Sequence, residues 1–519
     1  MHAISQFFSL PGLWLFFVAA CLAATSGWLL FNNREKAGVF LLWLAAFVVR
    51  LFTARLDPFL HNWDEKFHAL VARNMMDHPL TPMLRVNPIA PYNKFEWCCN
   101  HIWLHKQPLF MWQMALSIKL FGVSEMSARY PSILMGSLMV VMVYSIAKSM
   151  LGDKVVAFFA AVMFCFCNYQ LELISGYNGT DHNDIANGFY VLASIWAYQQ
   201  YLKERSIKFV MLIGLFAGCA VLNKWLLGLV VFSGWGVNML FAAKDTTILK
   251  QLLHFVSALL LACVVFIPWQ LYILHTFPEE AHYVYGFNSR HITEQLEGHS
   301  GSIFYYVRQL PVYFGWVVLP LLGCGLYTIV KRAMQNPRNR QMEVMWITVS
   351  FLVMLFFSLV VKTKWPPYVF LVAPFGFICI AACARAIERR FKLKVLLPLL
   401  IISASVSVFK PGQLALAHNP TDPYRIAKIN NTIIYKHLKS DLPANVKLVL
   451  NTVSFEDIDL MFYNGDINAY SWTLHPGIID SLEAAKVPFA VFKPHGLYGT
   501  PAEIINYPGV FIINKELKE

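Results

Sequence analysis

The stretch VKTKWPPYVFLVAP, residues 361–374, joins two long apolar runs and decides how the rest of the chain is understood. It places Lys362 and Lys364 at the end of one run and Tyr368 near the start of the next. A lysine at the mouth of a membrane helix is costly unless it meets water or an anion. The stretch therefore predicts a membrane protein with a site for a phosphate headgroup, and lysines that only extend toward the lipid surface are the alternative.

Composition indicates the same class of protein. Hydrophobic residues make up 57% of the 519 residues and charged residues only 14%. About twelve apolar runs are long enough to span a bilayer. They are residues 11–31, 37–54, 131–150, 155–172, 185–202, 207–222, 225–242, 251–271, 310–330, 343–361, 367–384 and 394–409. The expected fold is an all-α polytopic membrane domain over residues 1–409.

Basic residues set the expected orientation of these runs. The loops rich in Lys and Arg all fall on one side, which the positive-inside rule assigns to the cytoplasm. These loops account for the net charge of +12, so the basic character reflects topology and does not indicate nucleic-acid binding. The outer segments are then loops at 57–130, 173–184 and 275–309, followed by the tail.

The tail, residues 410–519, reads as a small separate domain. Strand-like runs at 446–450, 489–492 and 510–513 alternate with helical patterns near 423–439 and 455–463. This alternation predicts a compact α/β domain outside the cytoplasm.

The outer loops carry the candidate catalytic residues. Asp64 and Glu65 follow the second apolar run directly. A partly desolvated Asp64 would act as a general base or orient an acceptor, and the alternative is that it caps the next helix. Asp181 and Asp184 stand in SGYNGTDHND, where the pattern fits a metal, a polar substrate or a hydrated turn.

Two further outer segments contribute polar residues. Lys106 precedes a stretch in which Trp, Phe, Met and Leu recur at helical spacing beside Lys119, which predicts a helix lying in the membrane interface. The loop NSRHITEQLEGHSGSIFYYVRQLP adds Arg290 and His299.

The order of these motifs resembles a known family. An Asp-Glu pair after an early span, Lys-x-Pro before an amphipathic helix, LFGxxExxARxPS, an Asp at a later span, a Gly-His loop with Tyr-Tyr, and KxKxPxY follow one another within residues 57–385. Together they resemble the GT-C glycosyltransferases that use polyprenyl-phosphate sugars. The likeness is greatest to the lipid A aminoarabinose transferases, which share a clan with the protein O-mannosyltransferases.

The resemblance implies roles for particular residues. It makes Asp64 catalytic, with Glu65 beside it. The family also has a later aspartate, for which two residues are candidates. Relatives have a Phe five residues after it, which matches Asp184 and is the assignment we favour. The YxxxD pattern that precedes it in relatives matches Asp181. The donor phosphate would be met by basic and aromatic side chains, with Lys362 and Arg290 added from their positions: Lys106, Lys224, Lys364, Tyr368, Lys362 and Arg290.

The resemblance also implies a divalent metal, zinc or manganese. Relatives hold it with a loop histidine, which matches His299, and a glutamate, whose place is taken by His105. A His105–His299 pair is therefore the expected metal site.

The expected function is transfer of a sugar from a polyprenyl-phosphate donor to a lipid or glycan acceptor such as lipid A or a cell-envelope glycan. Direct displacement implies inversion at the anomeric carbon. The enzyme would lie among membrane lipids of a bacterial inner membrane, with its active site facing the periplasm. Protein O-mannosylation is the alternative within enzymes. A transporter or flippase of lipid-linked sugars is the alternative from another class, although the sequence shows none of the repeated halves common in transporters.

Overall fold

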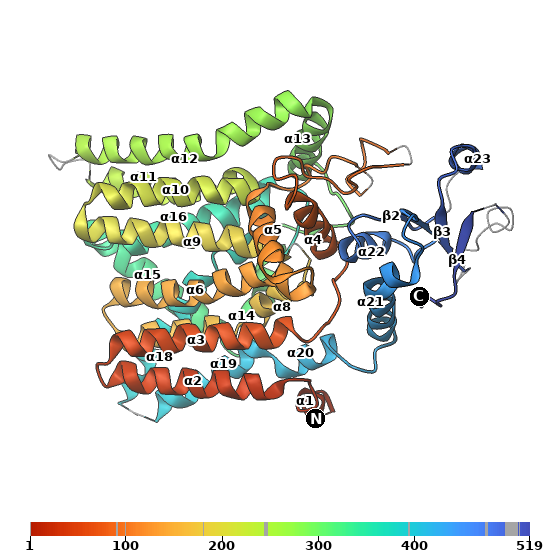
Figure 1. Cartoon of the computed structure of the whole chain (residues 1–519). Helices are drawn as coiled ribbons and strands as arrows, with labels where there is room; N and C mark the ends of the chain where they lie inside the picture. The colour runs from red at the N-terminus through yellow and green to blue at the C-terminus, as the bar shows by residue number, and fades with distance from the viewer. Residues whose placement is uncertain are drawn as a thin grey trace. The chain divides into compact units, whose positions relative to one another are not determined.

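The computed structural model describes residues 2–89, 92–98, 100–179, 181–242, 248–392, 395–472, 476–493, 507 and 509–519. By its internal contacts the chain divides into two units (Figure 1). The helical unit comprises Met1–Arg55 and Ser132–Ala415, and the α/β unit comprises Leu56–Pro131 and Leu416–Glu519.

The helical unit is built from long helices joined by short turns. Its elements are α1 (His2–Phe7), α2 (Leu13–Phe31), α3 (Glu35–Ala54), most of α6 (Glu125–Leu151), α7 (Lys154–Cys165), α8 (Asn168–Ile174), α9 (Asp181–Glu204), α10 (Ile207–Lys224), η1 (Trp225–Leu229), α11 (Val230–Ala242), α12 (Ile248–Thr276), α13 (Pro278–Thr293), α14 (Tyr305–Phe314), α15 (Leu319–Gln335), η2 (Pro337–Asn339), α16 (Gln341–Leu355), η3 (Phe356–Val360), α17 (Pro367–Phe370), α18 (Ala373–Phe391), α19 (Leu396–Phe409) and α20 (Pro411–Ala417).

The described helices confirm a polytopic membrane protein. Seven of them are long and apolar enough to cross a bilayer, and two bent helix pairs raise the number to 9. This is fewer than the about twelve apolar runs in the sequence. Helices α9 and α18 coincide with two of the remaining runs, but polar residues in α9 and charged residues at the end of α18 keep them out of that set.

Polar contacts and small residues bring the helices together. Helices α2 and α3 lie side by side, as do α9 and α10 (Figure 1). Ser26 of α2 donates a 2.7 Å hydrogen bond to the carbonyl of Gly38 in α3. The guanidinium of Arg50 in α3 is fully buried and donates to the side-chain oxygen of Gln170 in α8 at 2.5 Å. Such interhelical hydrogen bonds satisfy polar groups that hydrocarbon cannot.

The α/β unit combines two helices of the first outer loop with the tail. Its elements are α4 (Asp64–Met75), α5 (Leu109–Phe121), α21 (Pro423–Asp441), β1 (Leu448–Leu450), α22 (Asp457–Tyr463), β2 (Asn468–Tyr470), α23 (Pro476–Ala484), β3 (Phe489–Phe492) and β4 (Val510–Ile513). The predicted strands and helices of the tail are confirmed. Strand β2 and helix α23 were not expected, because NAY is too short and too polar to read as a strand.

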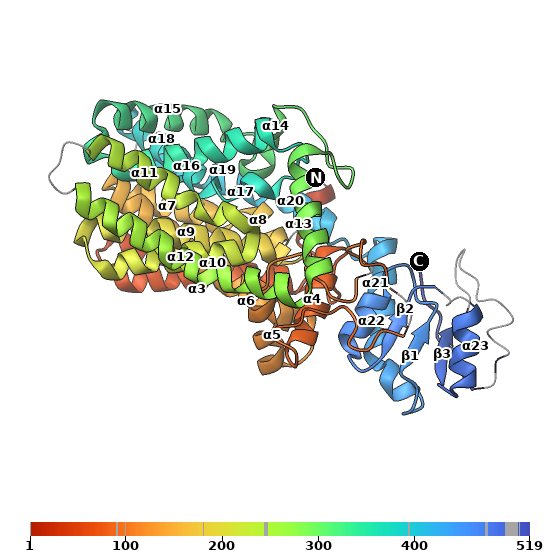
Figure 2. The ribbon, with the colours of Figure 1, turned by 90° about the horizontal axis from the view of Figure 1, so that it is seen from above.

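The strands form one parallel sheet in the order β2-β1-β3-β4. Val449 is aligned with Ala469 on one side and with Ala490 on the other. Figure 2 shows α23 on one face of the sheet and α21 and α22 on the other. Strands covered on both faces read as continuous apolar runs, as LVL and FAVF do here.

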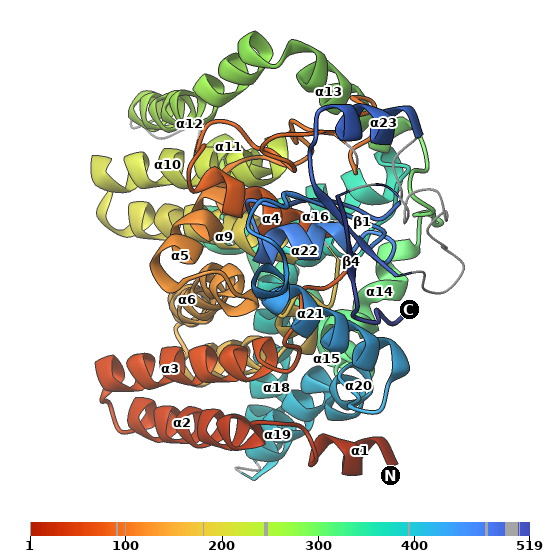
Figure 3. The same ribbon diagram turned by 45° about the vertical axis from the view of Figure 1, so that its right-hand side comes forward.

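Buried ion pairs join the first outer loop to the tail. Lys66 of α4 lies 3.4 Å from Asp459 of α22, and both side chains are almost fully buried. Arg85 pairs with Asp457 at 2.6 Å. Helices α4 and α22 are neighbours within this unit (Figure 3). A buried charge is stable only beside its partner, so these pairs hold residues 56–131 in the same unit as the tail. The sequence predicted a domain boundary at residue 410 and placed residues 56–131 in the other domain.

Candidate functional site

Asp64 lies in the first turn of α4, where its carboxylate meets two basic side chains. Its Oδ1 atom is 3.3 Å from the Lys106 Nζ atom and 3.8 Å from the His68 Nε2 atom. Only 16% of the Asp64 side chain is exposed, whereas the His68 ring is fully buried. Trp63, not Asp64, occupies the cap position of α4. The α/β unit thus brings together Asp64 and Lys106, which the resemblance singled out.

Glu65 is held by an arginine clamp. Arg129 of α6 donates to both Glu65 carboxylate oxygens, at 2.6 and 3.0 Å. The same guanidinium donates to the backbone carbonyls of Asp57 and Phe59, at 2.8 and 2.7 Å. The amide of His61 also donates to Glu65, at 2.7 Å. The Glu65 carboxylate therefore fixes the backbone immediately before Asp64.

A second buried carboxylate, Asp57, secures the start of the same segment. His418 Nδ1 lies 2.6 Å and His61 Nε2 3.1 Å from its Oδ2 atom. Arg425 donates to its Oδ1 atom at 2.6 Å and to the carbonyl of Leu56 at 2.5 Å. Burial alone raises the pKa of Asp57, but the hydrogen bonds and positive charges of the two histidines hold that pKa well below its usual range.

We expect Asp57→Asn to lower the free energy of unfolding of the full-length protein by about 3 kcal/mol at pH 7, because one partner of a buried charge cluster is lost. A carboxyl whose pKa falls on folding stabilises the native state above its unfolded pKa of about 3.9, and the contribution disappears as pH drops below that value. The gap between wild type and Asp57→Asn in thermal melts should therefore persist at neutral pH and narrow below about pH 4.

Asp466→Asn is the matched control. Asp466 pairs with Lys439 and Lys447 on the surface, and 41% of its side chain is exposed. Such a pair contributes about 0–1 kcal/mol, so this variant should melt close to wild type. An Asp57→Asn melt indistinguishable from that of the control would contradict the anchoring role.

In the helical unit, Asp184 and Lys224 form an ion pair between α9 and the end of α10. The Lys224 ammonium also lies 4.8 Å from the centre of the Tyr368 ring, within cation–π range. Asp184 lines a small cavity together with Gln170, Asn187 and Phe370. Three of the predicted site residues, from distant segments, thus meet in this unit.

Lys364 is buried and bonded to backbone. Its ammonium donates to the carbonyls of Phe357, Val361 and Ser358 at 2.5, 2.6 and 2.9 Å, at the end of the α16–η3 helix. Burial, and next the positive charge of Lys362, lower the pKa of Lys364. A cation suits the carbonyls at a helix C-terminus, so Lys364 also has a structural function.

The segment that carries Lys364 is paired with the third outer loop. The amides of Lys362, Thr363 and Lys364 donate to carbonyls of Ile292, His291 and His299, at 3.0 to 3.2 Å. The centres of the His299 and Trp365 rings are 3.6 Å apart. The sequence did not indicate this pairing, which places His299 beside the KxKxPxY motif.

The structure places the remaining predicted site residues, Arg290 and Lys362, in exposed positions. Arg290 is half exposed and pairs with Glu294 at 2.9 Å. Lys362 is exposed beside the buried Lys364. Helix α9 begins at Asp181, but the Asp181 side chain is outside the part of the chain that the structure describes.

The predicted metal pair is divided between the two units. His105 stacks on Trp97 in the α/β unit, with ring centres 5.1 Å apart, and His299 belongs to the helical unit. Among the described residues, no group of three or more His, Cys, Asp or Glu side chains is arranged to hold a metal ion. The described residues therefore do not by themselves fit a metal centre, and the pairing stays a prediction.

Arg129, Asp57, His418 and Arg425 were missed as candidates. Arg129 falls within the LFGxxExxARxPS motif, and a charged residue at the start of an apolar helix was an available signal. The Asp57 cluster joins residues more than 350 positions apart, which no local pattern reveals.

Comparisons with known proteins find similar glycosyltransferases. Residues 105–272 match the family model described as dolichyl-phosphate-mannose-protein mannosyltransferase. Undecaprenyl phosphate-alpha-4-amino-4-deoxy-L-arabinose arabinosyl transferase 2 of Proteus mirabilis (strain HI4320) is 25% identical over 391 residues, covering 70% of this chain. ArnT from Cupriavidus metallidurans, bound to undecaprenyl phosphate in its crystal, aligns with a TM-score of 0.64 and 17% identity, over 88% of this chain and 90% of that one. The chain therefore resembles membrane glycosyltransferases in sequence over part of its length, and in fold over most of it.

Another solved structure shares the fold at lower similarity. The archaeal oligosaccharyltransferase AglB from Archaeoglobus fulgidus aligns with a TM-score of 0.51 and 12% identity, over 84% of this chain and 64% of that one. The chain spans 63% of the length of the Proteus mirabilis protein and 56% of the length of an uncharacterized protein of Aquifex aeolicus (strain VF5), to which it is 24% identical.

Proposed function

We propose that this integral membrane protein transfers a sugar from a polyprenyl-phosphate donor to a lipid or glycan acceptor outside the cytoplasm. The pairing of Asp64 with Lys106 at 3.3 Å carries the proposal, because it joins a potential base to a cation. The named activity of the Proteus mirabilis relative, an undecaprenyl-phosphate-dependent transferase, supports the donor class.

The chemistry is a single displacement. An acceptor hydroxyl oxygen attacks the anomeric carbon, the bond from that carbon to the phosphate oxygen breaks, and polyprenyl phosphate leaves with the electron pair. Asp64 takes the hydroxyl proton, and the attack from the opposite face inverts the configuration. An acceptor phosphate would need no base, and Asp64 would then only orient it.

Basic side chains stabilise the leaving phosphate in this proposal. We assign this role to Lys224 in the helical unit, because Asp184 and Tyr368 hold its ammonium in a fixed position. Fixed cations stabilise a developing negative charge without having to reorganise. Glu65 acts by positioning Asp64, through the Arg129 clamp.

Protein O-mannosylation is the second candidate, and the description of the matching family model favours it. Both candidates are tested by incubating the purified full-length protein with a panel of radiolabelled polyprenyl-phosphate sugars, together with either native membrane lipids or acceptor proteins. Label in lipid or glycan supports the proposal, and label in protein supports the second candidate. Movement of labelled donor across vesicles without any transfer would contradict both and indicate a flippase.

We expect Lys364→Ala to lower kcat/KM for the donor by about ten- to hundredfold. The variant would lose a charge-assisted hydrogen bond to the donor phosphate, and such a bond contributes roughly 1.5–3 kcal/mol. Lys364→Arg should recover only part, since the larger planar guanidinium fits the three carbonyls less well. A titration with polyprenyl phosphate separates the phosphate role from helix capping. Unchanged affinity in Lys364→Ala, with a lower melting temperature than an exposed control such as Lys331→Ala, would assign Lys364 to capping alone.

We expect a chelator to lower transfer if His105 and His299 share a zinc or manganese ion. His105→Ala should then reduce the bound metal found by elemental analysis of the purified protein, whereas His78→Ala, an exposed histidine after α4, should not. Full activity in protein shown to be free of metal would reduce both residues to ordinary loop histidines.

A further inference from the structure

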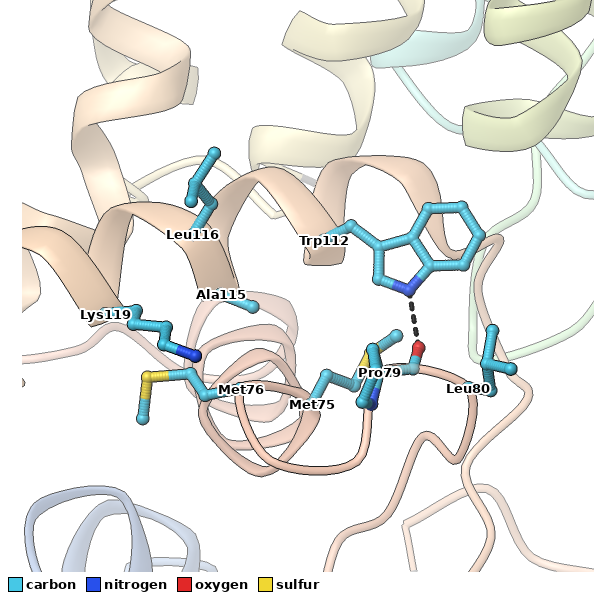
Figure 4. Close-up of a pocket in the computed structure, with 8 residues that line it drawn as sticks. All are labelled: Met75, Met76, Pro79, Leu80, Trp112, Ala115, Leu116 and Lys119. Atoms are coloured by element: carbon cyan, nitrogen blue, oxygen red, sulfur yellow. Dashed lines mark hydrogen bonds between the residues drawn. The ribbon is translucent and has the colours of Figure 1, made fainter.

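A groove runs along α5 in the α/β unit, and its lining does not include Asp64, Lys106 or His68 (Figure 4). Its volume is about 300 Å³, at the small end of the range for ligand sites. Met75 and Met76 at the end of α4 form one wall, and Trp112 and Leu116 of α5 form the other. The lining is therefore almost entirely hydrocarbon and thioether.

Helical spacing and one hydrogen bond explain why the groove exists. Trp112, Leu116 and Lys119 recur along one face of α5, and the small side chain of Ala115 leaves room between the walls. The Trp112 indole nitrogen donates to the carbonyl of Pro79 at 2.6 Å. This bond fixes the turn after α4 against α5 at one end of the groove.

The groove has a charged end and an apolar end. Figure 4 shows the exposed Lys119 at one end and Trp112 with Leu80 at the other. Elsewhere on α5, Leu120 and Phe121 are 67% and 65% exposed, which suits a helix in contact with hydrocarbon. An apolar channel that ends at a cation is complementary to an amphiphile with an anionic headgroup.

We propose that this groove holds one acyl chain of an anionic phospholipid of the surrounding bilayer, with the lipid phosphate at Lys119. Leu80 and Leu116 are 51% and 60% exposed, so the groove covers only one side of a chain. A substrate site encloses most of its ligand, whereas a bilayer lipid keeps its other side in hydrocarbon. The flexible Met75 and Met76 side chains suit acyl chains of varied shape. The proposal does not depend on the transferase activity.

The test is photolabelling of the full-length protein in detergent. The probes are phosphatidylglycerol and phosphatidylcholine with the same diazirine-bearing acyl chain, and labelled peptides are mapped by mass spectrometry. We expect phosphatidylglycerol to label residues 75–80 and 112–119 about fivefold more than phosphatidylcholine, the ratio that one lysine near a headgroup supplies. Lys119→Gln should abolish this preference, and Lys119→Arg should retain it.

A pair of leucines on α5 provides the matched control. Leu116→Gln should reduce labelling at both peptides several-fold, whereas Leu120→Gln, outside the groove, should leave it unchanged. Equal labelling by the two probes, or an unchanged preference in Lys119→Gln, would overturn the proposal. Competition by polyprenyl phosphate at lower concentration than by unlabelled phosphatidylglycerol would overturn it as well and assign the groove to the donor lipid.

Discussion

Asp64→Asn should abolish sugar transfer while leaving donor binding intact. The substitution keeps the shape of the side chain but removes the negative charge that pairs with Lys106 and the capacity to accept a proton. Loss of a general base costs about 10²- to 10⁴-fold in rate. The measurement is the turnover of radiolabelled polyprenyl-phosphate sugar by purified variant and wild type at saturating donor, with donor affinity measured separately.

Asp77→Asn is the matched control, because Asp77 is exposed just beyond the end of α4 and is not one of the proposed site residues. It should transfer at the wild-type rate. Turnover of Asp64→Asn close to that control would remove Asp64 from the mechanism. If the acceptor is a phosphate, the loss should be smaller, because the nucleophile is then already ionised.

Arg129→Gln should have the next largest effect, on both stability and activity. The change leaves the Glu65 carboxylate buried without its cation and deprives the carbonyls of Asp57 and Phe59 of a donor. Breaking a buried ion pair from one side costs about 3–5 kcal/mol. We expect a lower melting temperature, faster proteolysis within residues 56–63, and loss of transfer.

A double variant separates stability from positioning. Arg129→Met with Glu65→Leu removes both charges, and replacing a whole buried pair by apolar residues is often neutral for stability. Because Glu65 also accepts the amide of His61, the segment before Asp64 would remain unanchored in this variant. We therefore expect recovered melting but not recovered transfer. Recovery of both would show that the clamp stabilises the unit without positioning Asp64.

The sequence predicted the membrane class and the elements of the tail from local patterns. Composition alone identifies an apolar run that is as long as a bilayer is thick. It also identifies strands that are buried on both faces, such as LVL and FAVF. The resemblance also singled out Asp64, Asp184, Lys106, Lys224 and Tyr368 one by one. The structure brings Asp64 to Lys106 in one unit, and Asp184 to Lys224 and Tyr368 in the other.

Local sequence patterns did not predict the role of a charged residue where that role depends on burial. Lys362 and Lys364 read alike in the sequence, yet one is exposed and the other is buried on three helix carbonyls. Glu65 read as a neighbour of Asp64, and nothing in the sequence indicated that Arg129 holds its carboxylate.

The sequence by itself determined that this is a polytopic membrane protein with an α/β tail, because hydrophobic length and periodicity are local properties of the chain. Only the tertiary structure decided that the first outer loop belongs with the tail. The Asp57–His418–Arg425 cluster and the Lys66–Asp459 pair join segments more than 350 residues apart. Buried charges are stable only when such distant partners meet, and no short window of sequence contains both members of a pair.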